Sequence, residues 1–253
     1  MEKFEIVKIT PEGLTGIEKG VSEEVPLTIE VNGSEIATIL ASPFHIDDLA
    51  RGFLFTSGMI AEISGIRSLY IDMERFRVVA EFEGNLKDFV FKRIYTSGCG
   101  KGVIFHNPID VIGKTALSNG LEITAEKLVC LMKQFLSRQT EYCDTGGVHG
   151  AALASSEEIY VTREDIGRHN AIDKVIGASL AAGTGMADKI LLTTGRVSSE
   201  IFSKVLRARI PVIAALGGPT NQAVKLARVT NITLVGRLRG GRGEIYSGER
   251  RIL

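Results

Sequence analysis

The first third of the chain arranges apolar and polar residues in short alternating blocks, with one helical pattern between them. The stretch VPLTIEVNGSEIATILAS predicts two strands joined by Asn32–Gly33, the dipeptide most typical of a tight hairpin. The following HIDDLARGFLFTSGMI places its apolar residues at helical spacing, and IRSLYIDMERFRVVAEFE predicts two further strands. We therefore expect a small α+β domain over residues 1–92.

The rest of the chain alternates between strand and helix patterns. TAEKLVCLMKQFLSRQ predicts a helix capped by Thr124, and GAALASSEEIYVTRED predicts a strand hairpin. A helix from about Arg168 to Ala182 precedes the pairs KILLTTG with SSEIFSKVLRAR and PVIAALGG with TNQAVKLARV, and the strands ITLVG and EIYS follow. This order is typical of βα units on a mainly parallel sheet, so residues 93–253 are expected to form an α/β domain.

Charge and composition exclude several function classes. The 253 residues carry 30 basic and 30 acidic side chains, and this balance gives no support for a nucleic-acid or membrane-surface role. No apolar run approaches the ~20 residues of a membrane helix, and MEKFEIVKIT lacks the apolar core of a signal peptide. Three cysteines are too few for a disulfide framework. We expect a cytoplasmic protein with reduced thiols.

Two strand-to-helix junctions share one form. LLTTGRVSSE passes from a strand through Gly195 and Arg196 into a helix, and IAALGGPTNQ does so through Gly217–Gly218. Glycine allows the backbone to approach a ligand, and the first N–H groups of a helix bind phosphate. Each loop alone is compatible with an ordinary connection. Two such loops beyond the carboxyl ends of strands, one with an arginine, favour an anion site.

Two other segments concentrate polar chemistry. LVGRLRGGRGEIY sets Arg237, Arg239 and Arg242 around two glycines, which suits phosphate binding but also a solvated turn. CDTGGVHGAAL and TREDIGRHNAIDK gather ionisable residues beside glycines, where a functional site is as plausible as a structural cluster. These residues are Cys143, His149, Glu164, Asp165, Arg168, His169 and Asp173. Neither CxxC nor HExxH occurs, so a zinc site is not expected.

Cys99 is the strongest candidate for reactivity. It lies in YTSGCGKGVIF, where Lys101 and glycine amides favour a thiolate. Cys130, among Leu128, Val129, Leu131 and Met132, is expected to pack in the core, and the role of Cys143 stays open. A thiolate on such a loop can attack a carbonyl, carry sulfur as a persulfide, or form a disulfide; no second cysteine in the loop supports the last.

Taken together, these segments resemble the FdhD family of sulfur-carrier accessory proteins of formate dehydrogenase. The resemblance rests on PLTIEVNGSEIATILASP, DDLARGFLFTSGMI, TGGVHGAAL, REDIGRHNAIDKVIG, TGRVSSEIFSKV, GGPTNQAVKLA and LVGRLRGGRGEIYS, which cover nearly the whole chain. It implies a C-terminal α/β/α sandwich like that of cytidine deaminase. Deamination itself is not expected, because the chain has VHGAAL and no PCxxC pair.

The resemblance also implies a function. Family members take sulfur from a cysteine desulfurase as a cysteine persulfide and pass it to the molybdenum cofactor, bis-molybdopterin guanine dinucleotide, for formate dehydrogenase; they are typically homodimers. Carried over to this chain, the persulfide cysteine is Cys99. A guanine nucleotide would then mimic the cofactor at the binding stretch. That stretch is Arg237, Leu238, Arg239, Gly240, Gly241 and Arg242, with Arg196, His149, Arg168 and His169 lining the receiving pocket.

One departure keeps alternatives open. Many members carry two cysteines in this loop as CxxC, whereas this chain has only Cys99. A mechanism with an internal disulfide is therefore weakened, while a relay through one cysteine is not. The first alternative is a chaperone that binds the cofactor without moving sulfur. The second is a cysteine hydrolase using Cys99 with His149 or His169, although no hydrolase motif surrounds Cys99.

Overall fold

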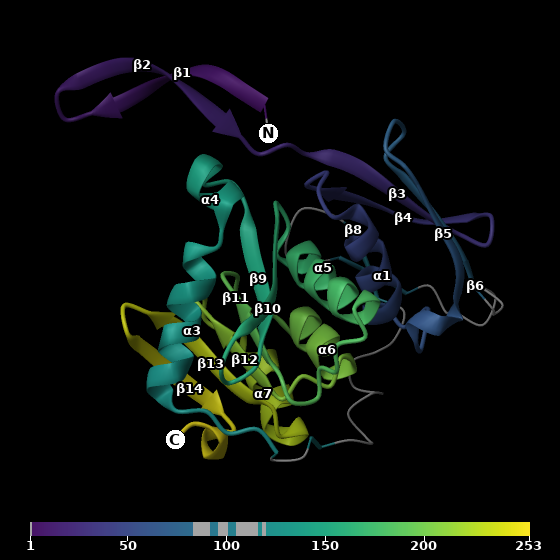
Figure 1. Cartoon of the computed structure of the whole chain (residues 1–253), viewed down its shortest axis with the longest axis vertical. Coiled ribbons are helices and arrows are strands. Elements are labelled where there is room, and N and C mark those ends of the chain that lie inside the picture. The colour runs from purple at the N-terminus through teal and green to yellow at the C-terminus, as the bar shows by residue number, and fades with distance from the viewer. Residues whose placement is uncertain (1, 83–91, 96–100, 105–115, 118–119) are drawn as a thin grey trace.

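The computed structural model describes residues 2–82, 92–95, 101–104, 116–117 and 120–253. These residues form two larger sheets, two separate two-stranded pairs and a set of helices (Figure 1). The mixed α/β class expected from the sequence is confirmed. The division of the chain at residue 92, and the likeness to the cytidine deaminase fold, stay predictions.

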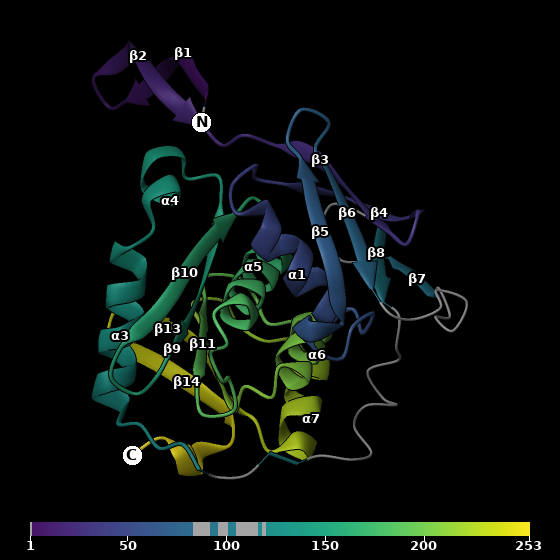
Figure 2. The ribbon, with the colours of Figure 1, turned by 45° about the vertical axis from the view of Figure 1, so that its right-hand side comes forward.

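The N-terminal part begins with a hairpin that projects from the body, formed by β1 (Glu2–Thr10) and β2 (Gly13–Val21) (Figure 1, Figure 2). A four-stranded sheet of order β4-β3-β6-β5 follows. Its strands are β3 (Val25–Val31), β4 (Ser34–Ala41), β5 (Ile66–Asp72) and β6 (Arg77–Phe82). The turn predicted at Asn32–Gly33 is confirmed, because both residues adopt positive φ, 47° and 76°. Two short strands, β7 (Lys92–Tyr95) and β8 (Lys101–Ile104), pair with each other.

The C-terminal part is built on a six-stranded sheet of order β10-β9-β11-β12-β13-β14. Its strands are β9 (His149–Ala154), β10 (Ile159–Asp165), β11 (Ile190–Thr193), β12 (Val212–Ala215), β13 (Thr233–Arg239) and β14 (Arg242–Ser247). The expectation of a mainly parallel sheet was wrong: only β11–β12 and β12–β13 are parallel pairs in it. Short turns join β9 to β10 and β13 to β14, and a short turn can join only antiparallel strands.

Helices cover both faces of this sheet. One face carries α3 (Ala125–Ser137), while the other carries α5 (Arg168–Ala181), α6 (Ser199–Arg207) and α7 (Asn221–Thr230) (Figure 1). Alternate residues of β9 show the two faces: Ala151 and Leu153 belong to the core under α5, Ala152 and Ala154 to the core under α3. The remaining elements are α4 (Thr140–Thr145) and the 3-10 turns Ile63–Gly65 and Glu249–Arg251. No helix among the described residues has the length and apolar character to cross a bilayer.

Helix α1 (Ile46–Thr56) connects the smaller sheet to α5. The two helices cross so closely that a Cβ atom at Gly52 would overlap the carbonyl oxygen of Asp173, and one at Gly177 would overlap that of Asp48. Side chains of the smaller sheet, α1 and α5 share one continuous core. This contact holds the middle of α5 against α1, and the predicted site residues Arg168 and His169 lie at the start of the same helix.

Helix α3 corrects one expectation. Thr124 caps it as predicted, accepting a hydrogen bond from the Lys127 backbone N–H at 3.3 Å. Cys130, however, is exposed and does not pack in the core. The buried face carries Leu128, Leu131, Met132 and Phe135, which are spaced by three, four and seven residues. Cys130 falls outside this stripe, so its apolar neighbours in sequence do not surround it in space.

Candidate functional site

One edge of the six-stranded sheet gathers most of the predicted site residues. Strands β10, β11, β12 and β13 end at this edge and β9 begins there, because β9 runs antiparallel to both β10 and β11. His149 therefore lies at the same edge as the loops that follow β11 and β12. Ligands of open α/β sheets bind beyond the carboxyl ends of strands, so the loops of the predicted anion site lie where such ligands bind, and the site itself stays a prediction.

The two strand-to-helix loops lie against each other. A Cβ atom at Gly217 would come within 2.7 Å of the Gly195 carbonyl oxygen and 2.8 Å of the Arg196 nitrogen. Val197 and Pro219 form a bridge between the loops, and the Thr220 N–H donates to the Val197 carbonyl at 2.9 Å. The starts of α6 and α7 are thereby aligned side by side. Arg196 is exposed at this position.

The caps of these two helices use part of their N-terminal donors. Ser198 Oγ accepts from the Ile201 N–H at 3.4 Å, and Thr220 Oγ1 accepts from the Ala223 N–H at 3.3 Å. Capped helix starts of this kind still present backbone N–H groups and the positive end of the helix dipole. The loops thus retain the electrostatics expected of an anion site.

The arginine segment, residues 237–242, begins next to the loop that follows β12. Arg237 adopts a positive φ of 53°, and its N–H donates to the Gly217 carbonyl at 3.2 Å. Its guanidinium Nε would lie 3.7 Å from a Cβ atom at Gly218, and its Nη1 is 3.6 Å from Glu244 Oε1. The junction after β12 and the arginine segment, far apart in sequence, are therefore neighbours.

Beyond Arg237 the chain forms the β13–β14 hairpin. Gly240 and Gly241 have φ of 59° and 77°, the pair of positive values that a two-residue turn needs and glycine adopts readily. Arg239 and Arg242 face each other at the mouth of this turn, and both are exposed. Leu238 points the other way and is buried in the core under α3. The structure thus presents the arginines to solvent and leaves Leu238 a packing role.

His149 lies beside a cavity at this edge. Its Nδ1 is 3.3 Å from Thr194 Oγ1, which also accepts from the Gly150 N–H at 3.0 Å. Burial, and then the charge of Arg168, lower the pKa of His149, so the imidazole stays neutral near pH 7. The cavity has a volume of about 350 Å³, and its wall combines apolar side chains with the polar groups of His149, Thr194 and Tyr142. It is lined by Leu136, Tyr142, Gly146, Gly147, Val148, His149, Ile166, Thr194 and Leu216.

His169 lies close to His149 and Arg168 at the start of α5. Its Nε2 is 3.3 Å from Glu200 Oε2 on α6. Burial chiefly, and then the charges of Lys204, Arg168 and His149, lower the pKa of His169 to about 3. Arg168 packs its aliphatic chain against Gly195, where a Cβ atom would come within 3.0 Å. The structure therefore brings His149, Arg168 and His169 together with the first loop.

Sequence reasoning missed the partners of His169. Glu200 and Lys204 are one turn apart on α6, and they face His169 and Asp173, one turn apart on α5. Lys204 Nζ lies 2.5 Å from Asp173 Oδ2, and Thr56 of α1 donates to the other oxygen at 2.7 Å. Burial raises the pKa values of Asp173 and Glu200. Matching spacings of four in RHNAIDK and SSEIFSK were the available signal.

Two acidic residues of the segment TREDIGRHNAIDK have structural roles. Glu164 accepts hydrogen bonds from the backbone N–H groups of Thr140, Glu141 and Tyr142 at 2.8–3.1 Å, which anchors the short helix α4 on the cavity wall. Asp165 forms a fully buried ion pair with Lys174, at 2.6 Å. The segment therefore shapes the cavity as well as lining it.

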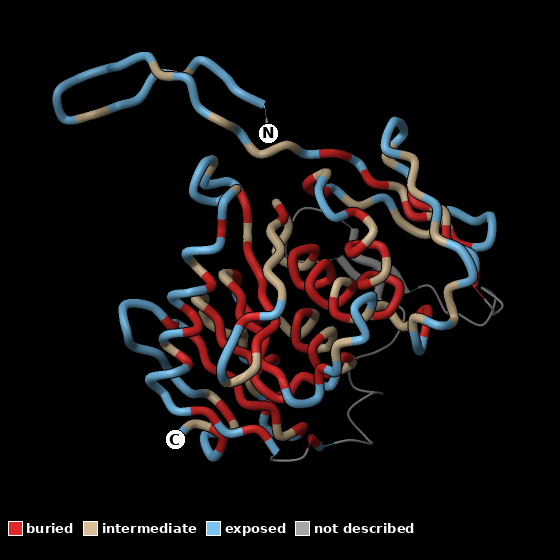
Figure 3. Tube along the Cα trace, viewed as in Figure 1, coloured by how far each residue is buried: buried red, intermediate tan, exposed pale blue. Residues whose placement is uncertain are grey.

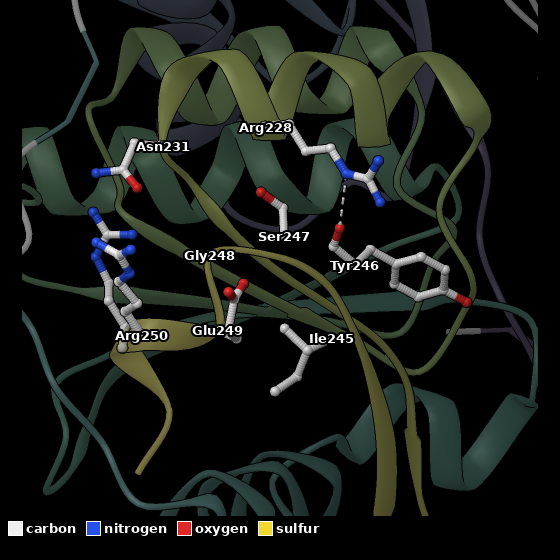
Figure 4. A pocket seen from close by; sticks show the side chains of 9 residues that line it. Arg228, Asn231, Ile245, Tyr246, Ser247, Gly248, Glu249 and Arg250 are labelled. Atoms are coloured by element: carbon white, nitrogen blue, oxygen red, sulfur yellow. Dashed lines mark hydrogen bonds between the residues drawn. The ribbon is translucent and has the colours of Figure 1, made fainter.

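A larger hollow lies at the opposite edge of the sheet (Figure 4). It has a volume of about 630 Å³, and Figure 4 shows Arg228 and Arg250 on its two sides with Ser247 between them. No residue predicted from the sequence as part of the site lines it. Of the predicted site residues, His149 lines the smaller cavity.

The comparisons with known proteins decide the family. The FdhD/NarQ family model matches residues 22–253. The chain is 41% identical to the sulfur carrier protein FdhD of Geobacillus kaustophilus, over 93% of the chain and 91% of the relative. This chain belongs to the FdhD/NarQ family. It is also 36% identical to the protein of that name from Bacillus subtilis, over 94% of the chain and 92% of the relative.

A solved structure has the same fold as this chain. A crystal structure described as a formate dehydrogenase accessory protein from Desulfotalea psychrophila matches with a TM-score of 0.82 and 25% identity. The match covers 100% of this chain and 99% of that one. The N-terminal hairpin, residues 2–21, precedes the segment that the family model matches.

Two of the three cysteines lie within the residues that the structure describes. Cys99 lies outside the residues that the structure describes, so its predicted role stays a prediction. Cys143 is exposed on α4, next to the cavity residue Tyr142, and Cys130 is exposed on α3. Within the described ranges, no cluster of His, Cys, Asp and Glu could hold a metal ion.

Proposed function

We propose that this protein is a sulfur carrier that accepts sulfur as a persulfide on Cys99 and passes it to the molybdenum cofactor, bis-molybdopterin guanine dinucleotide, for formate dehydrogenase. The relatives support the coarser role, because they are named sulfur carrier protein FdhD. The observation that carries the proposal is the meeting of Arg196, Gly218 and Arg237 at one sheet edge.

The geometry suits a nucleotide-bearing substrate. The aligned starts of α6 and α7, with Arg196 and Arg237, offer backbone N–H groups and guanidinium forks to phosphate oxygens. The neighbouring cavity of about 350 Å³ has apolar walls and a neutral His149, which suits a flat ring. We therefore infer that the cofactor is bound as a substrate at this edge, with phosphates on the loops.

The sulfur step on the protein is a thiol exchange. The Cys99 thiolate attacks the outer sulfur of the persulfide on a cysteine desulfurase, a new S–S bond forms on Cys99, and the donor cysteine leaves as a thiolate. The cations Arg168, Arg196 and Arg237 at the receiving edge would favour the approach of the persulfide anion.

Intact-protein mass spectrometry tests the carrier role. After incubation with an active cysteine desulfurase and cysteine, we expect the wild type to gain about one sulfur atom that reductant removes. Cys99→Ala should gain none, whereas Cys130→Ala and Cys143→Ala, which alter the two exposed thiols, should gain it as the wild type does. A gain that persists in Cys99→Ala, or no gain at all, would contradict the relay.

The alternative of a cofactor-binding chaperone makes a different prediction. Such a protein would bind a guanine nucleotide at the same edge without taking up sulfur. With guanosine diphosphate as the probe, we expect Arg196→Ala and Arg237→Ala each to weaken binding about tenfold, the effect of one charged hydrogen bond. Arg250→Ala in the opposite hollow is the matched control and should leave affinity unchanged. Binding with no sulfur uptake would favour the chaperone.

A further inference from the structure

Three charged side chains without ion-pair partners line the larger hollow, which lies at the opposite edge of the sheet from the candidate site. They are Arg228 of α7 and the adjacent Glu249 and Arg250, around a space of about 630 Å³. None of the three forms an ion pair with another residue in the described part of the chain. Figure 3 shows the turn near the C-terminus, to which Glu249 and Arg250 belong, at the periphery of the body. Figure 4 shows Glu249 between the two arginines, so the charges alternate across the hollow.

The floor of the hollow is a turn held by buried contacts. Gly248 has a positive φ of 69°, and a Cβ atom there would come within 2.6 Å of Thr233 Oγ1. Thr233 Oγ1 donates to the Gly248 carbonyl at 2.7 Å and accepts from Arg251 Nη1 at 3.1 Å. Arg251 itself is buried. Ser247 and Glu249, on either side of Gly248, therefore project from a backbone that is fixed in place.

Ser247 adds a buried hydroxyl to the wall of the hollow. The residue is 7% exposed, and no described residue forms a hydrogen bond with its hydroxyl. Figure 4 shows its hydroxyl between the side chains of Arg228 and Asn231. A buried hydroxyl without a hydrogen bond is unfavourable, so a ligand that supplies the missing partner is favoured. This observation, independent of the charges, also indicates a polar ligand.

Bonds to the backbone orient two further groups in the hollow. Arg228 Nε donates to the Tyr246 carbonyl at 3.4 Å, which leaves the Nη groups of its guanidinium for a ligand. Asn231 Nδ2 donates to the Leu117 carbonyl at 2.7 Å, and Figure 4 shows its amide oxygen on the side of Ser247. The hollow therefore combines guanidinium donors and an amide acceptor with its alternating charges.

We infer that this hollow binds a short acidic peptide, which carries carboxylates at its two ends and a free ammonium group between them. Each carboxylate accepts forked hydrogen bonds from one of the two arginines, Arg228 and Arg250. The ammonium group donates to Glu249, and the order of charges in the ligand is the complement of the order in the hollow. The volume of about 630 Å³ lies in the range of small-molecule sites.

The same charges disfavour a nucleotide in the hollow. A nucleoside diphosphate joins its negative charges in one group and has no positive centre to place beside Glu249, which repels the phosphates. A dicarboxylate without a nitrogen meets the same repulsion. Guanosine diphosphate and the acidic peptide are therefore expected at opposite edges of the sheet.

Isothermal titration calorimetry of the full chain with the tripeptide Asp-Gly-Asp, at low ionic strength, tests the inference. We expect a dissociation constant below about 1 mM for the wild type. Arg228→Ala and Arg250→Ala should each weaken binding about tenfold, the effect of one charged hydrogen bond. Lys225→Ala is the matched control, because Lys225 is exposed on the same helix but does not line the hollow, and it should leave the affinity unchanged.

Glu249 allows a test in which two probes respond in opposite directions. Glu249→Gln should weaken the binding of Asp-Gly-Asp about threefold, because the ammonium group loses its carboxylate. The same variant should strengthen the binding of succinate, a dicarboxylate without a nitrogen, because the repulsion is removed. Changes in the same direction for both probes would contradict the role of Glu249.

Three other outcomes would overturn the inference. They are no binding of Asp-Gly-Asp to the wild type, full affinity in both arginine variants, and tighter binding of the tripeptide acetylated and amidated at its ends. The last result would assign the hollow to an acidic segment within another protein chain. Sulfur uptake and the affinity for guanosine diphosphate should stay at wild-type values in the arginine variants, so failure here is distinguishable from failure of the proposed function.

Discussion

The body and the N-terminal hairpin, residues 2–21 (the arm), use the same alternation of apolar residues with opposite results. In β9 alternate residues enter two different cores, one under α3 and one under α5. In β1 the alternate residues Phe4 and Ile6, and Val7 and Ile9, face outward on two sides with little above them. An alternating pattern therefore predicts a strand, but what covers its faces depends on the rest of the molecule or on another one.

The contrast extends to charge. In the body, Lys174 and Asp165 pair with no exposure at all, and Lys204 and Asp173 pair with almost none. In the arm, Lys3 and Glu18 pair at 3.0 Å, and both side chains are more than half exposed. A buried pair leaves a strongly unfavourable charge behind when one partner is removed, whereas an exposed pair does not. Substitutions should therefore separate the two regions by the size of their effects.

The largest effect is expected for Lys174→Met. It leaves the buried carboxylate of Asp165 without its cation, which costs about 3–5 kcal/mol in the free energy of unfolding. Lys127→Met is the matched control, because its partner Glu157 is exposed, and it should cost less than about 1 kcal/mol. Urea denaturation measures both values. Equal costs for the two variants would contradict the assigned role of burial.

A smaller effect is expected where α1 and α5 cross. Gly177→Ala introduces a Cβ atom that overlaps the Asp48 carbonyl oxygen, so the helices must move apart at a cost of about 2–3 kcal/mol. Gly185→Ala is the control, since a Cβ atom there meets nothing within 4 Å. The measurement is the shift in denaturation midpoint. A loss as small as that of the control would show that the crossing tolerates a side chain.

Patterns that depend on neighbours in sequence predicted much of the body. The Asn32–Gly33 turn, the start of α5 at Arg168 and the two strand-to-helix loops follow from local glycines and helical spacing. The side-by-side arrangement of the loops, by contrast, comes from the parallel pairing of β11 with β12. The glycines of the two loops predict one anion site, and the pairing of the strands before them aligns the loops.

The misses have a common physical cause. Helix α4 has six residues and no apolar period, and it is held by the distant carboxylate of Glu164. The link between His169 and Glu200 exists only because α5 and α6 lie side by side. Cys130 was misjudged because adjacent residues on a helix point in different directions. Each case depends on a contact between residues distant in sequence or on the direction of a side chain. The adjacent residues in the sequence reveal neither.

The pH dependence of stability sharpens the account of His169. Its pKa is about 3 in the folded chain, against the ordinary 6.5 when unfolded, so below pH 6.5 the unfolded chain binds the extra proton. Stability should therefore fall as the pH drops from 7 to 5, with a contribution of about 2 kcal/mol from this residue. In His169→Gln that part of the slope should vanish. His45→Gln, which alters an imidazole more than half exposed, should change the slope far less.

The smallest effect on the fold is expected in the arm. Ile9→Lys and Leu14→Lys replace side chains that the body does not cover, so each should change the free energy of unfolding of the single chain by no more than about 0.5 kcal/mol. Urea denaturation measures this free energy of unfolding. A loss of several kcal/mol there would mean that the arm folds back onto its own body, and the contrast between the two regions would fail.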